Sequence, residues 1–238
     1  MPDEIFDRYF TCLQLPNLTC GQALDVGAGP GIQTELLLSR LPKGWKTLAI
    51  EPSLELATSA LARLDKFGNS TSLYNCRFEE LPAHAEFDVV WMSEVVHLLG
   101  NVSGWTGHLA TIMRTGGRVL IRTSTHTQLR DRHWYRFFPT ALKLDLARHP
   151  TKGSVLRGLT SAGFTNISAI TIDESRWIPA QYLLDMMRER AFSTLHFLSQ
   201  VELDKGLQRL RSSLDSQPET MWHYVMTAYT ATFQGGPL

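Results

Sequence analysis

The sequence predicts an α/β fold built around a doubly wound, largely parallel β-sheet. Short apolar runs alternate with amphipathic stretches from about residue 23 to residue 123. Such alternation is typical of parallel strands that are joined by crossover helices. The runs are also continuously apolar, as strands are when helices cover both faces of their sheet. The length of 238 residues fits one large domain of this kind with insertions, or such a domain with a small cap.

Each element of this first half follows from a local pattern. Apolar runs place strands at residues 23–27, 46–51, 73–78, 87–92 and 118–122. Apolar side chains at helical spacing place helices at residues 34–41, 53–66 and 105–114. Ser53 is suited to cap the second helix, and Pro42 ends the first. Residues 68–72 are expected to form a loop, and residues 115–117 a turn before the fifth strand.

The second half has a different character. Residues 125–150 are rich in aromatic residues and arginine and are expected to be irregular and partly helical. Helical patterns lie at residues 154–163, 179–199 and 203–214. Alternating side chains place strands at residues 166–173 and 221–233, the second being one long strand. We expect a single domain over residues 1–238, into which residues 125–150 and 178–215 are inserted.

Composition and charge narrow the class of protein. Hydrophobic residues make up 43% of the chain, which argues against disorder, and 23 acidic residues balance 23 basic ones. A neutral chain with only short basic clusters does not favour nucleic acid as a partner. The three cysteines, Cys12, Cys20 and Cys76, match no metal-binding spacing and suit a reducing compartment. With no signal pattern and no long apolar run, we expect a cytoplasmic monomer or homodimer without membrane segments.

The segment ALDVGAGPG at residues 23–31 is the first indication of a binding site. It delivers the chain to the carboxyl edge of the sheet, where ligands bind in open α/β folds. Gly27, Gly29 and Gly31 permit a tight turn there and let a ligand lie against bare backbone. Their G-x-G-x-G spacing differs from the G-x-G-x-x-G of dinucleotide folds. Asp25 is poorly suited to a pyrophosphate and suits instead a ligand with an ammonium group.

An acidic residue follows at the end of the second strand. Glu51 lies about 20 residues after the glycines, and a carboxylate there can accept hydrogen bonds from both hydroxyls of a ribose. Alone this signal is weak, but together with the glycine turn it is strong. A purely structural role for both motifs is the alternative.

These motifs resemble those of the class I S-adenosylmethionine-dependent methyltransferases, in the ubiquinone-synthesis-like subgroup (methyltransferase types 11 and 25). The resemblance runs from about residue 23 to residue 164 and includes DVGAGPG, IEPS, RFEELP, FDVVWMSEVVHLL, MRTGGRVLI and SVLRGLTSAGF. It implies a Rossmann-like, doubly wound sheet of seven strands whose last strand, residues 221–233, runs antiparallel. It also implies S-adenosylmethionine as cofactor, with residues 125–150 and 178–215 as helical cap insertions that cover the substrate.

The resemblance implies roles for individual residues. Asp25 and the glycines would contact the methionine end of the cofactor, and Glu51 its ribose. The backbone of Ser93 would also reach the methionine end, and residues 77–79 would lie along the adenine. The full cofactor-binding set comprises Asp25, Gly27, Ala28, Gly29, Gly31, Glu51, Pro52, Arg77, Phe78, Glu79 and Ser93.

The adenine loop departs from the family's pattern. Many relatives have Asp-Ala where this chain has Arg77-Phe78, so the usual acceptor for the adenine amino group is missing. The backbone of Phe78 or the carboxylate of Glu79 can replace it; alternatively, Arg77 is a solvated charge and Phe78 packs in the core. Aromatic residues near the N-terminus form either a short lid or the packed face of a first helix; they are Phe6, Tyr9 and Phe10.

Three histidines are candidates for proton transfer, because an imidazole titrates near neutral pH. His97 follows the fourth strand, and His126 and His133 lie in the first insertion. Packing of His97 on its helix is the alternative. The candidate substrate-binding residues are aromatic or cationic: Trp134, Tyr135, Arg136 and Tyr182. Such aromatic density suits a pocket for a flat or apolar acceptor and equally suits a small helical core, and a solvated Arg136 is as reasonable as one that steers a carboxylate.

A small organic acceptor, methylated at oxygen, nitrogen or carbon, fits these features best. The Asn/Asp-Pro-Pro-aromatic motif of enzymes that methylate bases or glutamine amides is replaced here by MSEV at residues 92–95. The sequence shows no carboxylate cluster for a metal and no cysteine pair for arsenic chemistry. The alternatives are a non-catalytic cofactor-binding partner or regulator, a nicotinamide-dependent oxidoreductase, and an enzyme that acts on protein or RNA.

Overall fold

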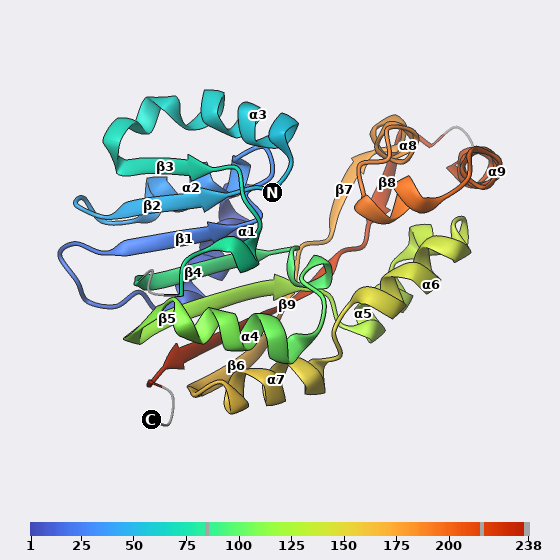
Figure 1. Ribbon diagram of the computed structural model, residues 1–238. Helices are drawn as coiled ribbons and strands as arrows, with labels where there is room; N and C mark the ends of the chain where they lie inside the picture. The colour runs from blue at the N-terminus through green and yellow to red at the C-terminus, as the bar shows by residue number, and fades with distance from the viewer. Residues whose placement is uncertain (84–85, 215–216, 236–238) are drawn as a thin grey trace. The chain divides into compact units, whose positions relative to one another are not determined.

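The computed structural model describes residues 1–83, 86–214 and 217–235, and the chain divides into two compact units (Figure 1). The first unit comprises residues 1–123, 150–170 and the segment that begins at Thr227. The second unit comprises residues 124–149 and 171–226. The chain passes between the units four times, so each unit is assembled from segments that are separated in sequence.

A seven-stranded sheet with the order β3-β2-β1-β4-β5-β9-β6 forms the centre of the fold. Its strands are β1 (Gln22–Val26), β2 (Lys46–Ile50), β3 (Thr71–Tyr74), β4 (Phe87–Ser93), β5 (Met113–Thr123), β6 (Phe164–Asp173) and β9 (Val225–Phe233). The first five strands run parallel to their neighbours, and β9 is antiparallel to β5. The strand order reverses between β1 and β4, which is where open α/β sheets bind ligands. The predicted fold, including the antiparallel last strand, is confirmed.

Helices of the first unit cover both faces of this sheet (Figure 1). They are α1 (Asp3–Leu13), α2 (Ile32–Arg40), α3 (Leu54–Leu64), α4 (Val102–Thr111) and α7 (Lys152–Ser161). On one face, Trp91 of β4 stacks on Phe6 of α1 at 4.8 Å and donates its indole N–H to Gln33 of α2. On the other face, Met92 is buried in the main core together with Leu109 of α4. Neighbouring residues of β4 therefore serve opposite layers, as the period of two in a strand requires.

The first helix packs against the sheet instead of standing free of it. Phe6, Tyr9 and Leu13 are the buried residues of α1, and their spacing places them on one face of the helix. Phe10 is half-buried and stacks on Phe6 at 6.3 Å. This arrangement supports the packed-helix interpretation of the N-terminal aromatic residues.

Several expected boundaries are corrected by the structure. The third strand ends at Tyr74, and Phe78 instead begins a short 3₁₀ helix, η2 (Phe78–Glu80). Residues 115–117 do not form a turn ahead of the fifth strand, because they lie inside β5, where its register with β4 shifts. Helix α4 begins at Val102 because the Asn101 side chain accepts a hydrogen bond from the N–H of Gly104. The Ser53 cap of α3 is confirmed by its bond with the N–H of Leu56.

The second unit is helical with a small two-stranded sheet. Its helices are α5 (His126–Asp131), η4 (His133–Arg136), α6 (Pro139–Arg148), α8 (Ala180–Arg188), η5 (Ser193–Phe197) and α9 (Gln200–Leu214). Strands β7 (Arg176–Pro179) and β8 (Glu219–Trp222) pair antiparallel. The long strand expected at residues 221–233 is thus wrong, since it is divided into β8 and β9, and the helix expected at residues 179–199 is divided into α8 and η5. Residue 215, the end of the second expected insertion, lies outside the described residues.

Candidate functional site

The glycine turn after β1 adopts the left-handed backbone that its sequence predicts. Gly27, Gly29 and Gly31 have φ values of 71°, 56° and 79°. A Cβ at Gly27 would lie 2.7 Å from the side chain of Val95, and one at Gly31 would lie 3.1 Å from Ala60. A Cβ at Gly29 would meet nothing within 4 Å. Two of the glycines therefore allow close packing of the protein on itself, whereas Gly29 borders open space.

Glu51 fixes this turn from the end of β2. Its side chain is 6% exposed, and its two carboxylate oxygens accept hydrogen bonds from the backbone N–H of Gly29 at 2.9 Å and of Ser53 at 2.8 Å. The Asn75 side chain donates to the carbonyls of Glu51 and Pro52 at 2.8 and 3.0 Å, which holds the same segment from the β3 side. A carboxylate oxygen can accept two hydrogen bonds, so each oxygen of Glu51 retains capacity for a ligand hydroxyl.

Asp25 is a buried carboxylate at the carboxyl end of β1. It is 2% exposed, and its Oδ2 accepts a hydrogen bond from the hydroxyl of Thr34 in the first turn of α2 at 2.6 Å. Burial raises the pKa of Asp25 to about 6, the hydrogen bond from Thr34 lowers it in part, and the charge of Glu51 raises it further. The site thus holds two carboxylates in different environments.

A cavity of about 360 Å³ opens beside Glu51 within the first unit. Three predicted segments, the glycine turn, the stretch after β2 and the loop after β3, border it together with the segment after β4. Its lining comprises Val26, Gly27, Ile50, Glu51, Pro52, Leu56, Cys76, Arg77, Phe78, Glu79, Val95, Leu98 and Leu99. Apolar walls with one buried carboxylate suit a flat, uncharged ring that is joined to a hydroxyl-bearing sugar. Of the predicted set, Asp25, Ala28, Gly29, Gly31 and Ser93 are not part of this lining.

The loop after β3 combines features of both earlier interpretations. Phe78 is buried, packs edge-to-face on His108 at 4.8 Å, and its carbonyl lies 2.9 Å from Nε2 of that histidine. Phe78 therefore belongs to the core and also borders the cavity. Arg77 and Glu79 are largely exposed, with their charged groups 3.9 Å apart. Glu80 holds the loop by accepting a hydrogen bond from the N–H of Arg77 at 2.7 Å.

Sequence reasoning missed a buried arginine at the end of β5. Arg122 is 5% exposed, donates to the hydroxyl of Ser93 at 3.2 Å and lies over the ring of Tyr9 at 5.5 Å. Its carbonyl accepts a hydrogen bond from the N–H of Glu94, whose φ is 55°. The sequence signal that could have identified Arg122 is a charged residue at the end of an apolar strand. His97 lies two residues beyond Val95, half-buried in η3 (Val96–Leu98).

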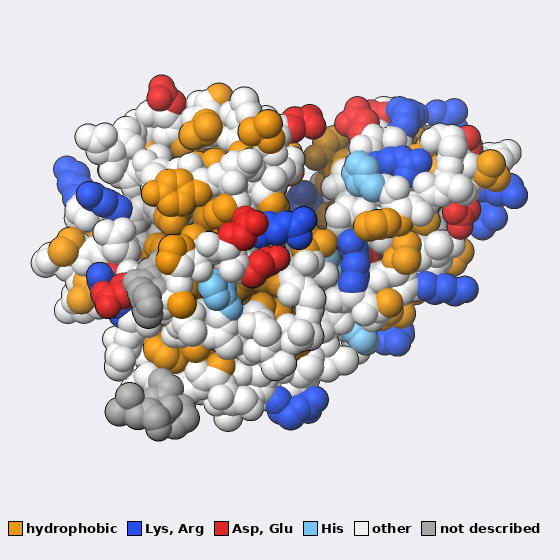
Figure 2. All heavy atoms as spheres, in the orientation of Figure 1, with side chains coloured by type: hydrophobic (Ala, Val, Ile, Leu, Met, Phe, Trp, Pro, Cys, Tyr) orange, Lys and Arg blue, Asp and Glu red, His pale blue; other side chains and the backbone are white. Residues whose placement is uncertain are grey.

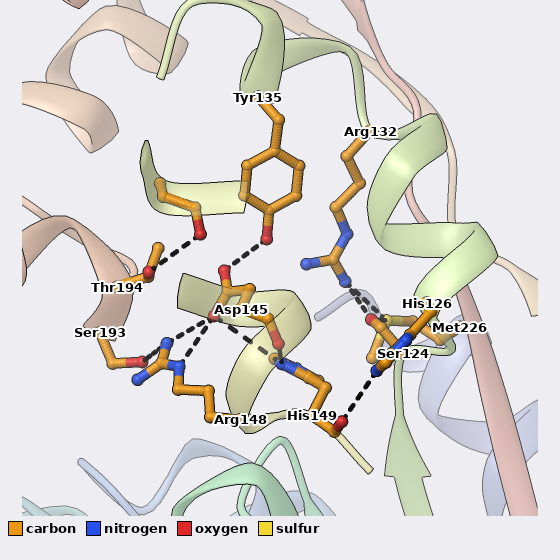
Figure 3. Close-up of polar contacts among 11 residues, drawn as sticks. Ser124, His126, Arg132, Tyr135, Asp145, Arg148, His149, Ser193, Thr194 and Met226 are labelled. Atoms are coloured by element: carbon orange, nitrogen blue, oxygen red, sulfur yellow. Dashed lines mark hydrogen bonds and ion pairs between the residues drawn. The ribbon is translucent and has the colours of Figure 1, made fainter. Parts of the chain in front are cut away.

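The other predicted site residues lie in the second unit, where two of them are in its core. Trp134 and Tyr135 are each 2% exposed, and Trp134 stacks on Tyr135 at 3.9 Å and on Phe192 at 5.2 Å. The Tyr135 hydroxyl donates to Asp145 at 2.5 Å, as Figure 3 shows. This placement supports the packing interpretation of both aromatic residues.

The remaining predicted residues are more accessible. Nε2 of His126 is hydrogen-bonded to the carbonyl of His149 at 2.9 Å, so this nitrogen carries the proton (Figure 3). His133 is exposed, and its pKa is lowered by partial burial and by the charge of Arg136. Arg136 is exposed and lies over the ring of Phe137 at 4.6 Å. Tyr182 is half-exposed on α8.

A polar network around Asp145 was not anticipated from the sequence. Asp145 accepts hydrogen bonds from Tyr135 and from Nε and Nη2 of Arg148 at 2.9 and 2.6 Å, and Arg148 also donates to Ser193 (Figure 3). Arg132 donates to the Ser124 hydroxyl and packs on a tyrosine ring of the same unit. These contacts join α6, η4 and η5 within the second unit.

Four further observations concern the surface charge, the helices, possible metal ligands and the cysteines. On the face drawn in Figure 2, acidic and basic side chains are interspersed among hydrophobic ones. Within residues 1–83, 86–214 and 217–235, no helix has the length and apolar character required to cross a bilayer. Over the same ranges, His, Cys, Asp and Glu side chains do not gather in a group of three or more that could hold a metal ion. All three cysteines are free thiols.

Residues 4–169, well over half of the chain, match the family model described as a methyltransferase domain. The chain belongs to this methyltransferase family. S-adenosylmethionine is the cofactor of the family and therefore of this protein. The residues around the cavity fit it, because the Glu51 carboxylate stands in an apolar cavity next to open space at Gly29.

Several known proteins resemble this methyltransferase chain in sequence or in structure. The ubiquinone biosynthesis O-methyltransferase of Bradyrhizobium sp. (strain ORS 278) is 29% identical over 115 residues, which cover 48% of this chain and 42% of that protein. The chain thus spans less than half the length of this curated relative. The YcgJ protein of Bacillus subtilis superposes with a TM-score of 0.68 at 12% identity, over 99% of this chain and 100% of that chain. Phosphoethanolamine N-methyltransferase 2 of Haemonchus contortus, solved with S-adenosyl-L-methionine, superposes with a TM-score of 0.62 at 16% identity, over 97% of this chain and 52% of that chain. Both structures share the fold.

Proposed function

We propose that this protein transfers the methyl group of S-adenosylmethionine to a small organic acceptor. The observation that carries the proposal is the Glu51 carboxylate, which is buried beside the apolar cavity and tied to the glycine turn by the 2.9 Å hydrogen bond from Gly29. A carboxylate so fixed can accept the ribose hydroxyls without moving, which lowers the entropic cost of binding.

The proposed cofactor contacts follow the order of the chain. The cavity between Glu51 and Phe78 takes the adenosine, with Pro52, Arg77 and Glu79 at its rim. The methionine end lies along the glycine turn, where Gly27, Ala28, Gly29 and Gly31 present backbone and Asp25 faces the ammonium group. The backbone of Ser93 at the end of β4 completes this end of the site.

The cofactor supplies a methyl group on a good leaving group, so the protein has mainly to bind and orient. In-line displacement requires the acceptor atom to be held opposite the leaving sulfur and water to be kept away. Of the proposed catalytic histidines, His97 stands in the sequence between the lining residues Val95 and Leu98 but is not itself part of the cavity lining. His126 and His133 remain proposals for removing a proton from the acceptor, and His126 would act through Nδ1, since Nε2 holds its proton against a carbonyl.

The nature of the acceptor is also part of the proposal. Of the predicted aromatic residues, the half-exposed Tyr182 favours a flat or apolar molecule, with Arg136 available for a carboxylate, whereas Trp134 and Tyr135 are buried in the core of the second unit. The similarity to ubiquinone biosynthesis O-methyltransferases favours a hydroxyl of such a molecule as the methylated atom. The free cysteines suit the cytoplasm as the place of this reaction.

Calorimetric titration tests the proposal. We expect micromolar binding of S-adenosylmethionine and S-adenosylhomocysteine, no binding of NADH, and loss of binding in Asp25→Ala and Glu51→Ala, with the exposed Glu55→Ala as a matched control. Binding would then justify a screen of small aromatic and carboxylate-bearing acceptors for product by mass spectrometry. Absence of adenosyl binding to the unmodified chain would overturn the proposal, and binding without any methylated product would favour a non-catalytic partner or regulatory subunit.

A further inference from the structure

Thr34 directs its hydroxyl to a side chain of the sheet, outside its own helix. It lies in the first turn of α2, is fully buried, and its hydroxyl donates to Oδ2 of Asp25 at 2.6 Å. Asp25 itself is 2% exposed, so the bond joins two side chains from which water is largely excluded. Hydrogen bonds to a charged acceptor in such surroundings are among the stronger ones in proteins.

Two threonines that lie deeper in their helices behave differently from Thr34. Thr58 of α3 donates to the carbonyl of Leu54, and Thr106 of α4 donates to the carbonyl of Val102, each at 2.8 Å. This bond to the carbonyl four residues back is the ordinary choice for threonine in a helix. The residue four before Thr34 is Pro30, which precedes the N-cap Gly31 and so lies outside α2; its carbonyl accepts from Nε of Arg63 at 3.0 Å. Thr34 is therefore directed away from its own helix and toward β1.

The bond from Thr34 decides how the Asp25 carboxylate is presented. A single hydrogen bond to Oδ2 fixes the rotation of the carboxylate about its last side-chain bond. It thereby determines which oxygen faces α2 and which faces the other way. Residues 26–33 connect Asp25 and Thr34, and they include the glycine turn that borders the cavity, so this hydrogen bond closes the turn at its base.

We propose that Thr34 is a positioning residue for the cofactor, which orients the Asp25 carboxylate so that Oδ1 is presented to the ammonium group of S-adenosylmethionine. This inference rests on the proposed function and adds to it a residue that does not touch the cofactor. The hydroxyl has a second effect, because a bond donated to a carboxylate favours its ionised form. Glu51 at the end of β2 acts in the opposite direction, while Trp91 pairs with Asp25 from the β4 side and brings no charge.

Binding of two ligands to three variants tests the inference. S-adenosylhomocysteine carries the ammonium group, and 5′-methylthioadenosine has the same adenosine and thioether without the amino acid. Thr34→Val keeps the shape of the side chain and removes the donor, whereas Thr34→Ser keeps the donor. We expect Thr34→Val to lower the affinity for S-adenosylhomocysteine about tenfold at neutral pH, because one hydrogen bond to a charged group is lost. Its affinity for 5′-methylthioadenosine should change by less than about twofold. Thr34→Ser should bind both ligands nearly as the unmodified protein does.

The pH profile gives a second readout that a merely structural role would not move. Affinity for S-adenosylhomocysteine should fall as Asp25 becomes protonated, and in Thr34→Val this fall should begin at a higher pH, while the profile for 5′-methylthioadenosine stays flat. Equal weakening of both ligands, or unchanged affinity for both, overturns the inference. If Thr34→Val does not fold, Thr34→Cys provides a weak donor of similar size and should bind S-adenosylhomocysteine more weakly than Thr34→Ser does, with its affinity for 5′-methylthioadenosine unchanged. Failure of the unmodified protein to bind S-adenosylhomocysteine would count against the proposed function instead.

Discussion

Oε2 of Glu51 accepts a hydrogen bond from the backbone N–H of Gly29 at 2.9 Å, across 22 residues of chain. The other carboxylate oxygen accepts from Ser53 at the start of α3. One side chain therefore holds two backbone segments at the carboxyl edge of the sheet, and the proposed ribose contact depends on the same two oxygens.

The first prediction follows from this pair of hydrogen bonds to Glu51. Glu51→Gln replaces one acceptor oxygen by a donor that faces a backbone N–H, so we expect the affinity for S-adenosylhomocysteine to fall at least about tenfold and the free energy of unfolding to fall by about 1–3 kcal/mol. Calorimetric titration and urea unfolding measure the two effects. Glu55→Gln, on the exposed side of α3, is the control and should change neither. Unaltered affinity in Glu51→Gln would remove Glu51 from the proposed site.

Gly29 and Gly116 provide a matched pair for the second prediction. Both have positive φ, 56° and 85°, and a Cβ at either position would meet nothing within 4 Å. Alanine at each should cost about 1–2 kcal/mol of stability through left-handed backbone strain. Gly29→Ala should in addition lower the affinity for S-adenosylmethionine severalfold, because the added methyl group enters the space proposed for the ligand. Gly116→Ala should leave this affinity unchanged, because Gly116 lies near the N-terminal end of β5. Thermal unfolding and calorimetry distinguish the outcomes, and equal affinity in the two variants would contradict the proposed path of the cofactor.

The third prediction concerns the pH dependence of stability. The pKa of Asp25 in the folded protein is about 6, above the ordinary value of 3.8, so the folded state holds this proton more tightly than the unfolded chain does. The resulting stabilisation is complete below about pH 4 and is lost as pH rises through about 6, for a total of about 3 kcal/mol. Asp25→Asn carries no such charge, so its stability relative to the unmodified protein should increase between these pH values and then stay constant.

Urea unfolding at several pH values between about 4 and 8 measures this trend. Asp88→Asn is a control at a second carboxylate, which accepts hydrogen bonds from the N–H of Gln22 at 2.8 Å and from Arg114 at 3.0 Å. It should be less stable than the unmodified protein near neutral pH. A parallel pH dependence for Asp25→Asn and the unmodified protein would show that Asp25 titrates normally.

The fourth prediction addresses the interior of the second unit. Asp145 is buried and accepts hydrogen bonds from Tyr135 and Arg148, so Asp145→Asn should lower the free energy of unfolding by about 2–4 kcal/mol by leaving a half-buried guanidinium without its ionised partner. The exposed pair Asp185–Arg188 is the matched control, and Asp185→Asn should cost less than about 0.5 kcal/mol. Similar losses in the two variants, measured by urea unfolding, would mean that the Asp145 network does not stabilise the fold.

The sequence predicted those elements whose burial is decided locally. The apolar run at residues 87–92 became β4 almost to the residue, and the glycine turn took the positive φ values that its spacing required. The expected strand at residues 221–233 failed because alternation of side chains continues through the break. Ser175 lies at the break: its hydroxyl is hydrogen-bonded to His223 and accepts from the N–H of Tyr224, each at 3.0 Å. Because Ser175 lies 48 residues before His223, the local sequence pattern around His223 does not reveal this contact.

The candidate site shows the same limit. Asp25 and Glu51 were identified because strand ends and glycine spacing mark them, and both lie where they were expected. Arg122 was missed, because the burial of an arginine at a strand end depends on Ser93 and Tyr9, which come from other elements. Trp134 and Tyr135 attracted attention by their chemistry, but aromatic density does not distinguish a pocket wall from a core.

The four passages of the chain between the two units constrain how the protein can be recombined with its relatives. Residues 124–149 and 171–226 are held together by bonds such as that from Arg148 to Ser193 and that from Thr140 to Glu202, both 2.9 Å. A chimera with a single crossover inside either segment would join halves that evolved with different partners. Transfer of the second unit between homologues therefore requires both segments to be moved in one step, with the first unit kept from one parent.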